Sequence, residues 1–367
     1  MSSPYKFLLA GLVPLGIYTL HSLSRTNGLF PKLTQACETK LLTDSTTAWP
    51  TWLQKSPELA GFLVSFFWPL ATGSHITGAL NSLAFVGNSF AMWIVTMIEA
   101  GRGGTRGSVI SFMFFSITIY GLLFQLGGIG VIGPAYLALN LSLSPIASDP
   151  KLSNIAIPDL AYLRAVPYAL ITGFLLPTLA MALPHPSVDT KMAALLFWQA
   201  FPLWTWISTH LFKAFFPTEL ALPKKQLPLL RKAYGLGLVL ATSTHIAVVS
   251  LSLASTVAPA IFRSAVLGDL TLASIFLPTL STEKIASVGE GGLKFLQWDY
   301  MIISLSQIIW AAAQTSKVDR KGLGFSVGNV WIDAALRTAV FGPLGAALTL
   351  IWERDEVVLG ETAAKKS

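Results

Sequence analysis

Long apolar runs without formal charge constrain this fold more than any other feature of the sequence. Six such runs contain no Asp, Glu, Lys, Arg or His other than His75: residues 59–98, 107–148, 165–184, 192–209, 246–262 and 300–316. A helix needs about 20 apolar residues to cross the hydrocarbon core of a bilayer, so the first two runs are long enough to cross twice. The sequence therefore predicts an all-α fold, a polytopic integral membrane bundle of about 8–10 transmembrane helices.

The composition supports the lipid bilayer as the partner of this chain and argues against nucleic acid. Only 12% of the residues are charged, whereas soluble domains average about 25%. The net charge of +7 comes from short basic clusters between apolar segments, such as Arg102–Arg106 and Lys224–Lys232, and such loops normally set orientation in a membrane. The lone Cys37 excludes an internal disulfide and gives no metal-ligand spacing, so no metal site is predicted.

The chain is predicted to form a single integral membrane domain, residues 1–367. Candidate membrane-spanning segments are residues 6–23, 59–77, 80–99, 108–127, 129–144, 164–183, 192–213, 234–257, 260–278, 295–314 and 333–352. We expect larger extramembrane loops at 24–57 and 279–294, and a polar, solvent-exposed tail at 353–367. Segment 6–23 is predicted as the first crossing, with a cleaved signal peptide as the alternative.

Two of these segments have open alternatives. Arg263 and Asp269 interrupt segment 260–278, which is therefore the weakest span and is alternatively interfacial or re-entrant. The stretch 108–144 is either one long kinked helix or a hairpin that is broken within the glycine-rich part from Gly127 to Pro134.

Glu99 is the first acid that falls within a long apolar stretch, and such acids are costly in hydrocarbon and are functional candidates by default. Three residues precede it on the same helical face: Asn81, Asn88 and Met92. A structural interpretation is equally open, because Asn commonly forms hydrogen bonds between membrane helices. Arg102 also lies three residues after Glu99, so the two side chains are predicted to be able to form an ion pair.

Asp299 is the second such acid, and the sequence places it between Trp298 and Tyr300. Desolvation raises the pKa of a carboxyl group, and an acid that is protonated near neutral pH is able to donate a proton. Trp310 follows on the same predicted helical face. Lys294 lies five residues upstream, so the alternative is that Asp299 sits at the level of the lipid headgroups.

A third acid, Asp333, is predicted to have a structural role. Arg337 follows it by four residues, so the two can pair on one helical face and keep the carboxylate ionised. The histidines His75, His210 and His245 are dispersed and show no metal-ligand spacing.

Aromatic residues and missing motifs together narrow the chemistry. The chain has 11 Trp, 8 Tyr and 22 Phe, and the face of an aromatic ring attracts cations. Candidate pocket or cation-stabilising residues are Trp68, Asn88, Trp93, Trp298, Tyr300 and Trp310. The sequence has no DDxxD or DxxxD pair for Mg²⁺ and diphosphate, no GxxxxGK[ST] loop and no HExxH helix. These absences argue against a cyclase that begins by ionising a diphosphate.

Three stretches resemble one family of fungal membrane proteins. The first is Phe66-Phe67-Trp68-Pro69 with Gly73, Phe85, Gly87, Asn88, Trp93 and Glu99-x-x-Arg102; the second is Gln297-Trp298-Asp299-Tyr300 running to Trp310; the third is Phe341-Gly342-Pro343 with Gly345 and Trp352-Glu353-Arg354. The chain is similar in these motifs to the membrane-bound terpene cyclases typified by the ascofuranone, ascochlorin and macrophorin meroterpenoid pathways. The pattern covers most of the chain, with 24–57 and 145–163 the least supported parts.

The resemblance implies an enzyme that cyclises a hydrophobic prenylated aromatic or polyketide substrate, often after epoxidation of its terminal double bond. It implies no metal or redox cofactor and a location in the endoplasmic reticulum or another endomembrane. Carried over by position, Asp299 and Glu99 are the membrane acids and Arg102 is the basic partner. Two positions depart from the family pattern, because Asn88 stands where Gln is usual and Trp298 stands where Tyr is expected.

We therefore predict Asp299 as the general acid, with Glu99 as a second acid or as the base that ends the reaction. Arg102, Asp333 and Arg337 are predicted to form structural ion pairs. Two other classes of function remain open from the sequence. They are a transporter or exporter of a hydrophobic metabolite and a non-catalytic membrane scaffold of a biosynthetic complex.

Overall fold

The computed structural model describes residues 4–42, 46–105, 116–219, 222–319 and 328–364. These residues form helices and connecting turns, with no β-strand among them beyond one isolated bridge between Leu41 and Ala48. The predicted all-α fold is therefore confirmed. Hydrophobic runs without alternating polarity, interrupted by Gly and Pro, favour this outcome because a helix satisfies its own backbone hydrogen bonds.

The α-helices have the following bounds: α1 (Pro4–Gly16), α2 (Leu23–Thr26), α3 (Leu29–Thr39), α4 (Thr51–Gln54), α5 (Glu58–Ala71), α6 (Ile76–Gly101), α8 (Ile117–Gly127), α9 (Ile129–Leu143), α10 (Pro145–Ser148), α11 (Leu152–Ile155), α12 (Leu160–Leu170), α13 (Leu176–Ala182), α14 (Val188–Gln199), α15 (Phe201–Ala214), α16 (Pro223–Val257), α17 (Leu272–Phe276), α18 (Val288–Thr315), α19 (Val330–Phe341) and α20 (Pro343–Ala364). Two π-helical segments continue α1 and α12, namely η1 (Ile17–Ser22) and η2 (Ile171–Leu175). Three short 3₁₀ turns follow α16: η3 (Pro259–Ile261), η4 (Ser264–Val266) and η5 (Gly268–Leu270).

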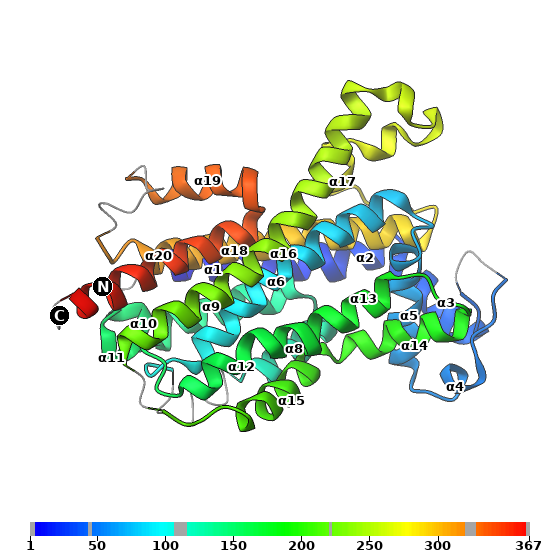
Figure 1. The fold of residues 1–367 in the computed structure, drawn as a ribbon. Helices are drawn as coiled ribbons and strands as arrows, with labels where there is room; N and C mark the ends of the chain where they lie inside the picture. Colours follow the sequence, from blue (N-terminus) through cyan, green and yellow to red (C-terminus); the bar gives the residue numbers. More distant parts are fainter. Residues whose placement is uncertain (1–3, 43–45, 106–115, 220–221, 320–327, 365–367) are drawn as a thin grey trace.

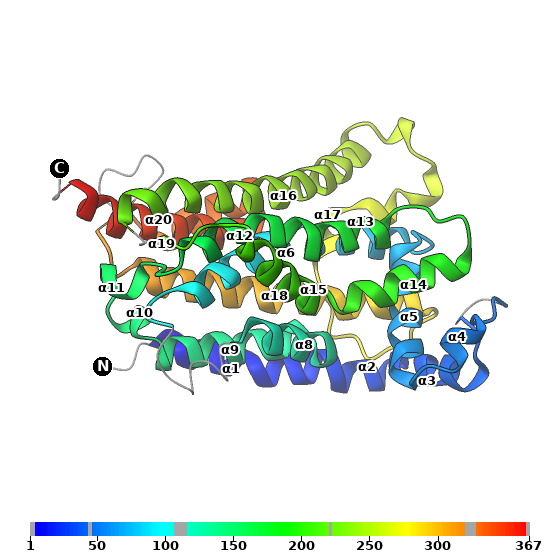
Figure 2. The same ribbon diagram turned by 60° about the horizontal axis from the view of Figure 1, so that its bottom comes forward.

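The long helices run side by side along one direction, with α3, α4 and α5 gathered at one end (Figure 1). Helix α6 lies at the centre and packs against α16, α12, α18 and α20. The most apolar 18-residue stretch of α6 is 78% buried inside the protein, whereas the corresponding stretch of α16 is only 22% buried. Figure 2 shows α8 and α9 beside α1 along one edge of the bundle. The core is therefore built around α6, and α16 forms an outer face.

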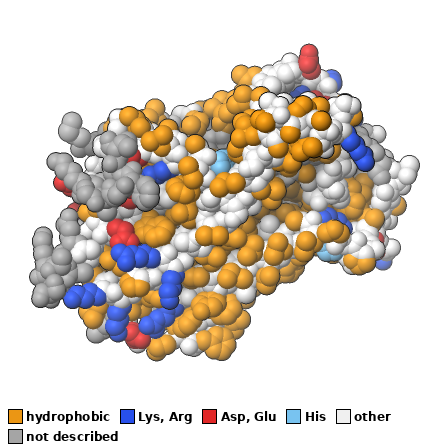
Figure 3. All heavy atoms as spheres, turned by 45° about the horizontal axis from the view of Figure 1, so that its top comes forward, with side chains coloured by type: hydrophobic (Ala, Val, Ile, Leu, Met, Phe, Trp, Pro, Cys, Tyr) orange, Lys and Arg blue, Asp and Glu red, His pale blue; other side chains and the backbone are white. Residues whose placement is uncertain are grey.

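Four helical segments are long and apolar enough to cross a membrane: 4–26, 76–101, 160–182 and 223–257. Shorter apolar helices occupy 58–71, 117–127 and 129–143. Exposed hydrophobic side chains cover much of the face that Figure 3 shows, which is compatible with contact to lipid. The prediction of about 8–10 crossings remains a prediction.

Glycine residues divide two of the predicted segments into helical hairpins. Gly128 has a φ of +81° and separates α8 from α9. Tyr120 and Tyr136, eight residues on either side of it, stack with ring centroids 4.1 Å apart. The hairpin alternative for 108–144 is therefore correct for residues 117–143, and residues 108–115 lie outside the described part of the chain. Gly342, with a φ of +74°, likewise separates α19 from α20, so the prediction of one span at 333–352 is wrong. Positive φ values are readily adopted only by glycine, which explains both positions.

Further boundaries differ from the predictions. Segment 192–213 is interrupted at Ala200 between α14 and α15, and segment 260–278 contains only short helical turns and α17. The predicted loop 24–57 contains α3 and α4, and the loop at 279–294 ends early because α18 begins at Val288, where the Ser287 side chain caps it.

The prediction of a solvent-exposed tail at 353–367 is wrong for its first part. Helix α20 continues to Ala364, and Arg354 and Asp355 within it are fully buried. Long-range ion pairs hold these two side chains inside the protein, and hydropathy along the chain cannot reveal such pairs.

Candidate active site

A cavity of about 170 Å³ lies between the core helices and is lined almost entirely by apolar side chains. Ten aromatic residues contribute to its wall: Phe30, Phe62, Phe66, Phe67, Phe85, Phe124, Phe174, Trp198, Phe201 and Phe295. Many of these rings contact one another, and the Phe66 ring meets the Phe295 ring edge-on at 5.2 Å between centroids. The cavity is therefore a mainly apolar space whose walls present aromatic π-systems.

Asp299 on α18 is the acidic residue of this cavity wall, and within the described part of the chain no other carboxylate lines it. Its side chain is buried, with 6% of the residue exposed. Oδ1 accepts a hydrogen bond of 2.6 Å from the backbone N–H of Gly130, in the first turn of α9. Lys294, the predicted neighbour at the headgroup level, instead pairs with Glu290 at 2.8 Å. Asp299 thus reaches the cavity without a cationic partner among the described residues.

The glycines at the start of α9 make this arrangement possible. A Cβ atom on Gly130 would lie 3.0 Å from Oδ1 of Asp299 and 3.3 Å from its Cα atom, which is closer than normal packing allows. The start of α9 therefore approaches Asp299 closely enough for the hydrogen bond only because Gly130 has no side chain. The positive end of the helix dipole faces the carboxyl group there, which stabilises negative charge on it.

Two of the predicted aromatic residues support the wall from behind. Tyr300 stacks on Phe85, with ring centroids 4.9 Å apart. Trp93 packs edge-on against Phe124 and Phe201, with centroid distances of 5.8 and 5.1 Å. Neither Tyr300 nor Trp93 lines the cavity, but both fix the rings that do.

The remaining predicted pocket residues point elsewhere. The indole N–H of Trp298 donates to the Thr279 carbonyl at 3.0 Å, and that of Trp310 donates to Asn140 Oδ1 at 2.8 Å. Trp68 is partly buried and packs on the outside of the core cluster. These three tryptophans do not line the cavity, so predicting them as wall residues is wrong for this cavity.

Asn88 connects helices instead of facing the cavity. Its amide donates to the Ala241 carbonyl of α16 at 3.3 Å and accepts from the Leu344 N–H of α20 at 3.1 Å. It therefore provides the interhelical hydrogen bonds that were the structural alternative for this face of α6.

Most residues of the cavity wall were not predicted from the sequence. On α6 the wall is formed by Ser82, Phe85, Val86, Ser89 and Met92, which share a helical face. This face shares Met92 with the predicted one but is rotated away from the amides of Asn81 and Asn88. Spacing by three and four residues indicates which residues share a face of α6. It could not identify the face that lines the cavity, because every face of α6 is largely apolar.

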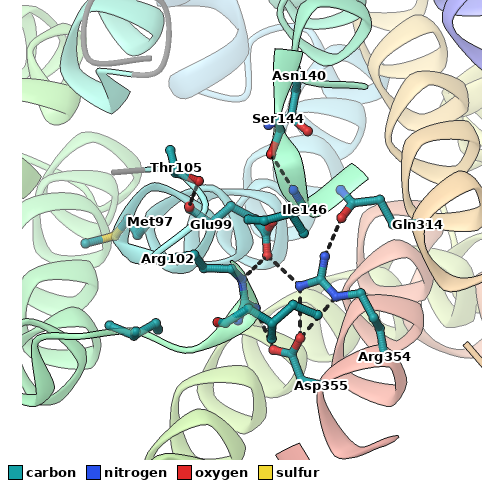
Figure 4. Close-up of polar contacts among 12 residues, drawn as sticks. Met97, Glu99, Arg102, Thr105, Asn140, Ser144, Ile146, Gln314, Arg354 and Asp355 are labelled. Atoms are coloured by element: carbon teal, nitrogen blue, oxygen red, sulfur yellow. Dashed lines mark hydrogen bonds and ion pairs between the residues drawn. The ribbon is translucent and has the colours of Figure 1, made fainter. Parts of the chain in front are cut away.

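Glu99 lies in a different place, within a buried network of two acids and two arginines (Figure 4). Its Oε1 is 2.5 Å from Arg102 Nε and 2.7 Å from Arg354 Nη2. Asp355 closes the network, with Oδ2 2.5 Å from Arg102 and Oδ1 2.9 Å from Arg354. The predicted contact between Glu99 and Arg102 is confirmed. Glu99 does not line the cavity and is not brought together with Asp299.

Further hydrogen bonds satisfy the network on every side. The Tyr234 hydroxyl donates to Asp355 at 2.8 Å, and Arg102 Nη1 donates to the Ile155 carbonyl at 2.7 Å. Arg354 also donates to Gln314 on α18. The two positive and two negative charges compensate one another, as buried charges require. The network therefore joins α6, α16, α18 and α20.

Arg337 donates to Glu353 and, at 3.2 Å, to Thr349 Oγ1, so it connects α19 to α20. Asp333 is buried on the same helix. The predicted pair between Asp333 and Arg337 stays a prediction.

Comparison with known proteins decides the family. The family model described as the CtvD domain matches residues 5–359, almost the whole chain. The chain belongs to the CtvD family. The terpene cyclase ascI of Acremonium egyptiacum is 33% identical over 96% of this chain and 92% of its own length. The terpene cyclase ctvD of Aspergillus terreus is 28% identical over 82% of this chain and 83% of its own length.

A third relative of this CtvD family member is the terpene cyclase penA of Penicillium crustosum, which is 27% identical over 96% of both chains. The predicted membership in a family of fungal terpene cyclases is confirmed. No solved structure matches this chain.

Proposed function

We propose that this CtvD family member is a membrane-bound terpene cyclase of a fungal meroterpenoid pathway, and that Asp299 starts the reaction as a general acid. The observation that carries the proposal is one carboxyl group, without a cationic partner among the described residues, in a cavity walled by aromatic rings. Removal from water disfavours the charged form of such a group, so a proton is available for transfer. The relatives that are named terpene cyclases support the same class of reaction.

The proposed substrate is a linear prenyl chain on an aromatic or polyketide core, with an epoxide at its terminal double bond. An epoxide oxygen has lone pairs and is much more basic than a carbon–carbon double bond, so a carboxylic acid suits it better. Asp299 donates its proton to the epoxide oxygen as the bond to the more substituted carbon breaks. A double bond of the chain supplies the electron pair that closes the ring, and the resulting cation then gives a proton to the Asp299 carboxylate, which restores the acid and leaves a neutral cyclic product.

The walls of the cavity suit the positive charge that this step creates. Phe66, Phe85 and Phe295 share the cavity with Asp299, and ring faces stabilise cations most strongly where water is absent. Exclusion of water also protects the intermediate from premature capture. Trp93 and Tyr300 contribute by holding the wall rings in place.

The hydrogen bond from Gly130 supports the part of the proposed mechanism that follows proton transfer from Asp299. After Asp299 has released its proton, the carboxylate is stabilised by the Gly130 N–H and by the positive end of α9. No metal or redox cofactor takes part in this mechanism. Glu99 is assigned a structural role instead of the catalytic one, because two arginines already neutralise it outside the cavity.

The apolar outer helices support a location in a lipid bilayer, and we propose that this bilayer is that of the endoplasmic reticulum or another endomembrane. The protein would then take its substrate from the membrane in which it resides.

The test is expression in a fungal host without the pathway, followed by incubation of microsomes with a prenylated arene that carries a terminal epoxide. We expect wild-type microsomes to form a cyclic isomer of the substrate, and Asp299→Asn to lower the rate about 10²–10⁴-fold. Asp269→Asn, which makes the same change at an exposed position, is the matched control and should cyclise at the wild-type rate. Equal rates for wild type and Asp299→Asn would exclude Asp299 as the acid. Absence of any cyclic product would exclude the cyclase function.

A further inference from the structure

His21 lines the cavity, and the proposed mechanism does not use it. Its Nε2 atom lies 3.0 Å from the carbonyl oxygen of Gly127, and the two residues are 106 positions apart in sequence. A carbonyl oxygen only accepts hydrogen bonds, so Nε2 carries the hydrogen atom and is the donor. This bond therefore joins η1 to the last residue of α8.

The carbonyl group that accepts this bond belongs to the turn between α8 and α9, residues 127–130, which we call the hairpin tip. At the other end of the hairpin tip, the backbone N–H of Gly130 donates to Asp299 Oδ1 at 2.6 Å. His21 and Asp299 both line the cavity, although they lie near opposite ends of the chain. The hairpin tip therefore forms one hydrogen bond to each of two polar side chains of the cavity wall.

Close packing holds the hairpin tip against η1 and α1. A Cβ atom on Gly128 would lie 2.7 Å from Leu20 Cδ1, and a Cβ atom on Gly16 would overlap the carbonyl oxygen of Gly130. The backbones approach this closely only because these positions are glycines. Since η1 also packs against α18, which carries Asp299, the hairpin tip is held between the two elements that supply its hydrogen-bonding partners.

The backbone that carries His21 is unusual as well. His21 lies in η1, a π-helical segment between α1 and α2, and π-helical turns are rare and frequently occur at functional sites. Within the described residues the chain has one other such segment, η2, which contributes Phe174 to the same cavity. The His21 ring lies beside that of Phe30, with centroids 6.2 Å apart. Both π-helical segments therefore supply residues of the cavity wall.

We propose that His21 is a positioning residue for Asp299 and acts through the hairpin tip. The inference rests on the proposed cyclase function. The imidazole N–H fixes the Gly127 carbonyl, and the hairpin tip thereby holds the Gly130 N–H against the carboxyl group of Asp299. A hydrogen bond to a carboxylate stabilises the form that remains after the proton has left, so it favours transfer of the proton. Loss of the His21 bond should weaken this effect without removing the acid.

The first test compares replacements of His21 by the turnover of the epoxide-bearing prenylated arene in microsomes. His21→Leu removes the donor (or His21→Asn, which shortens it, if the Leu variant does not fold), and we expect kcat to fall about tenfold with KM nearly unchanged. His21→Gln keeps an N–H donor at the end of the side chain and should retain most of the wild-type kcat. His210→Leu, the same change at an exposed histidine outside the cavity, is the matched control. Equal losses in the Leu and Gln variants of His21 would overturn the role of the hydrogen bond.

The second test asks whether His21 acts through the hairpin tip. Gly130→Ala places a methyl group within 3.0 Å of Asp299 Oδ1 and forces α9 away from the carboxyl group. Once that link is broken, the His21 bond no longer positions Asp299. Adding His21→Leu to Gly130→Ala should therefore lower kcat further by less than about twofold. Reductions that multiply would show that the two residues act independently, and this outcome would overturn the proposal.

The third test needs no turnover and measures the reaction of Asp299 with dicyclohexylcarbodiimide, an apolar reagent that modifies protonated carboxyl groups. Mass spectrometry locates the modification, and Asp299→Asn gives the background. His21→Leu weakens a hydrogen bond that favours the ionised carboxylate, so we expect modification to be several-fold faster than in wild type or His21→Gln. A rate that does not rise would overturn the positioning role. A faster rate, with no cyclic product from wild type, would retain that role and reject the cyclase function.

Discussion

Asp299 and Glu99 are two buried acids on core helices, and their surroundings are opposite. Asp299 faces an apolar cavity and accepts a hydrogen bond from one backbone N–H group. Glu99 is held by two arginines in a network that also contains Asp355. The charge of a buried carboxylate between two arginines is compensated, whereas a buried carboxylate without a cation lacks this compensation. The presence or absence of a cationic partner, more than burial, therefore decides which of the two acids is available for a reaction.

The two regions also differ in what they connect. The network ties Glu99 of α6 to Arg354 of α20, across 255 residues of sequence. The cavity wall is formed by aromatic rings from many helices, and its acid accepts a hydrogen bond from Gly130 in the first turn of α9. One region therefore connects the helices, and the other provides the space in which we propose that the reaction takes place.

The largest effect on stability is expected for Glu99→Gln. This change leaves Arg102 and Arg354 with one carboxylate, and loss of one partner from a buried ion pair costs about 3–5 kcal/mol. We expect a lower melting temperature and less folded protein by fluorescence-detected size-exclusion chromatography in detergent, with kcat per folded molecule unchanged. Asp299→Asn should show the reverse, a normal melting temperature and lost turnover. If Glu99→Gln melts normally but loses turnover, the roles of the two acids are exchanged.

The next effect concerns the backbone that positions Asp299. Gly130→Ala places a methyl group within 3.0 Å of Oδ1, so α9 and the carboxyl group must move apart. Small displacements of a catalytic group are costly, and we expect kcat to fall about tenfold or more. Gly235→Ala on α16 is the matched control, because a Cβ atom there meets no atom within 4 Å. Wild-type turnover by Gly130→Ala would show that the hydrogen bond to Asp299 does not serve the reaction.

The aromatic wall should have a smaller effect on rate and a distinct effect on products. Phe295→Leu keeps the wall apolar but removes one π-face beside Asp299, which is worth about 0.5–2 kcal/mol of cation stabilisation. We expect kcat to decrease a few-fold and the share of products captured by water to rise, as measured by mass spectrometry of microsomal extracts. Phe197→Leu removes a ring that is 48% exposed and stacks on Trp204. An equal change in both variants would argue against cation stabilisation by the wall.

The fold class and the buried position of Asp299 could be predicted from the sequence for physical reasons. Uncharged runs such as 59–98 are typical of membrane-spanning helices, and an acid that interrupts such a run is expected to have a partner or a function. Asp299 was favoured as the acid because no cation lies closer to it in sequence than Lys294, and Lys294 pairs with Glu290 instead. The contact between Glu99 and Arg102 was also predictable, because residues three apart face one another on a helix.

The partners that are distant in sequence could not be predicted. Arg354 and Asp355 belong to a polar stretch at the end of the chain, and only the packing of α20 against α6 brings them to Glu99. The cavity wall was missed for a related reason. Phe66, Phe124 and Phe201 resemble the other phenylalanines of the apolar segments, and which ring faces a space depends on helix rotation. Tryptophans were selected for their π-faces, but the indole N–H of Trp298 and of Trp310 instead binds a distant oxygen.

The smallest effect on stability should come from the loss of an ion pair at the surface. Comparison of this pair with the buried network tests whether burial determines how much an ion pair contributes. Arg231 pairs with Glu356 at 2.6 Å, but the Arg231 side chain is 55% exposed. An exposed pair contributes about 0–1 kcal/mol, so Arg231→Ala should lower the melting temperature only slightly, and less at high salt. Asp355→Asn removes a negative charge from the buried network, where Asp355 pairs with Arg102 and Arg354, so it is expected to lower the melting temperature much more. If both variants destabilise the protein equally, charge compensation inside the network is not what stabilises the bundle.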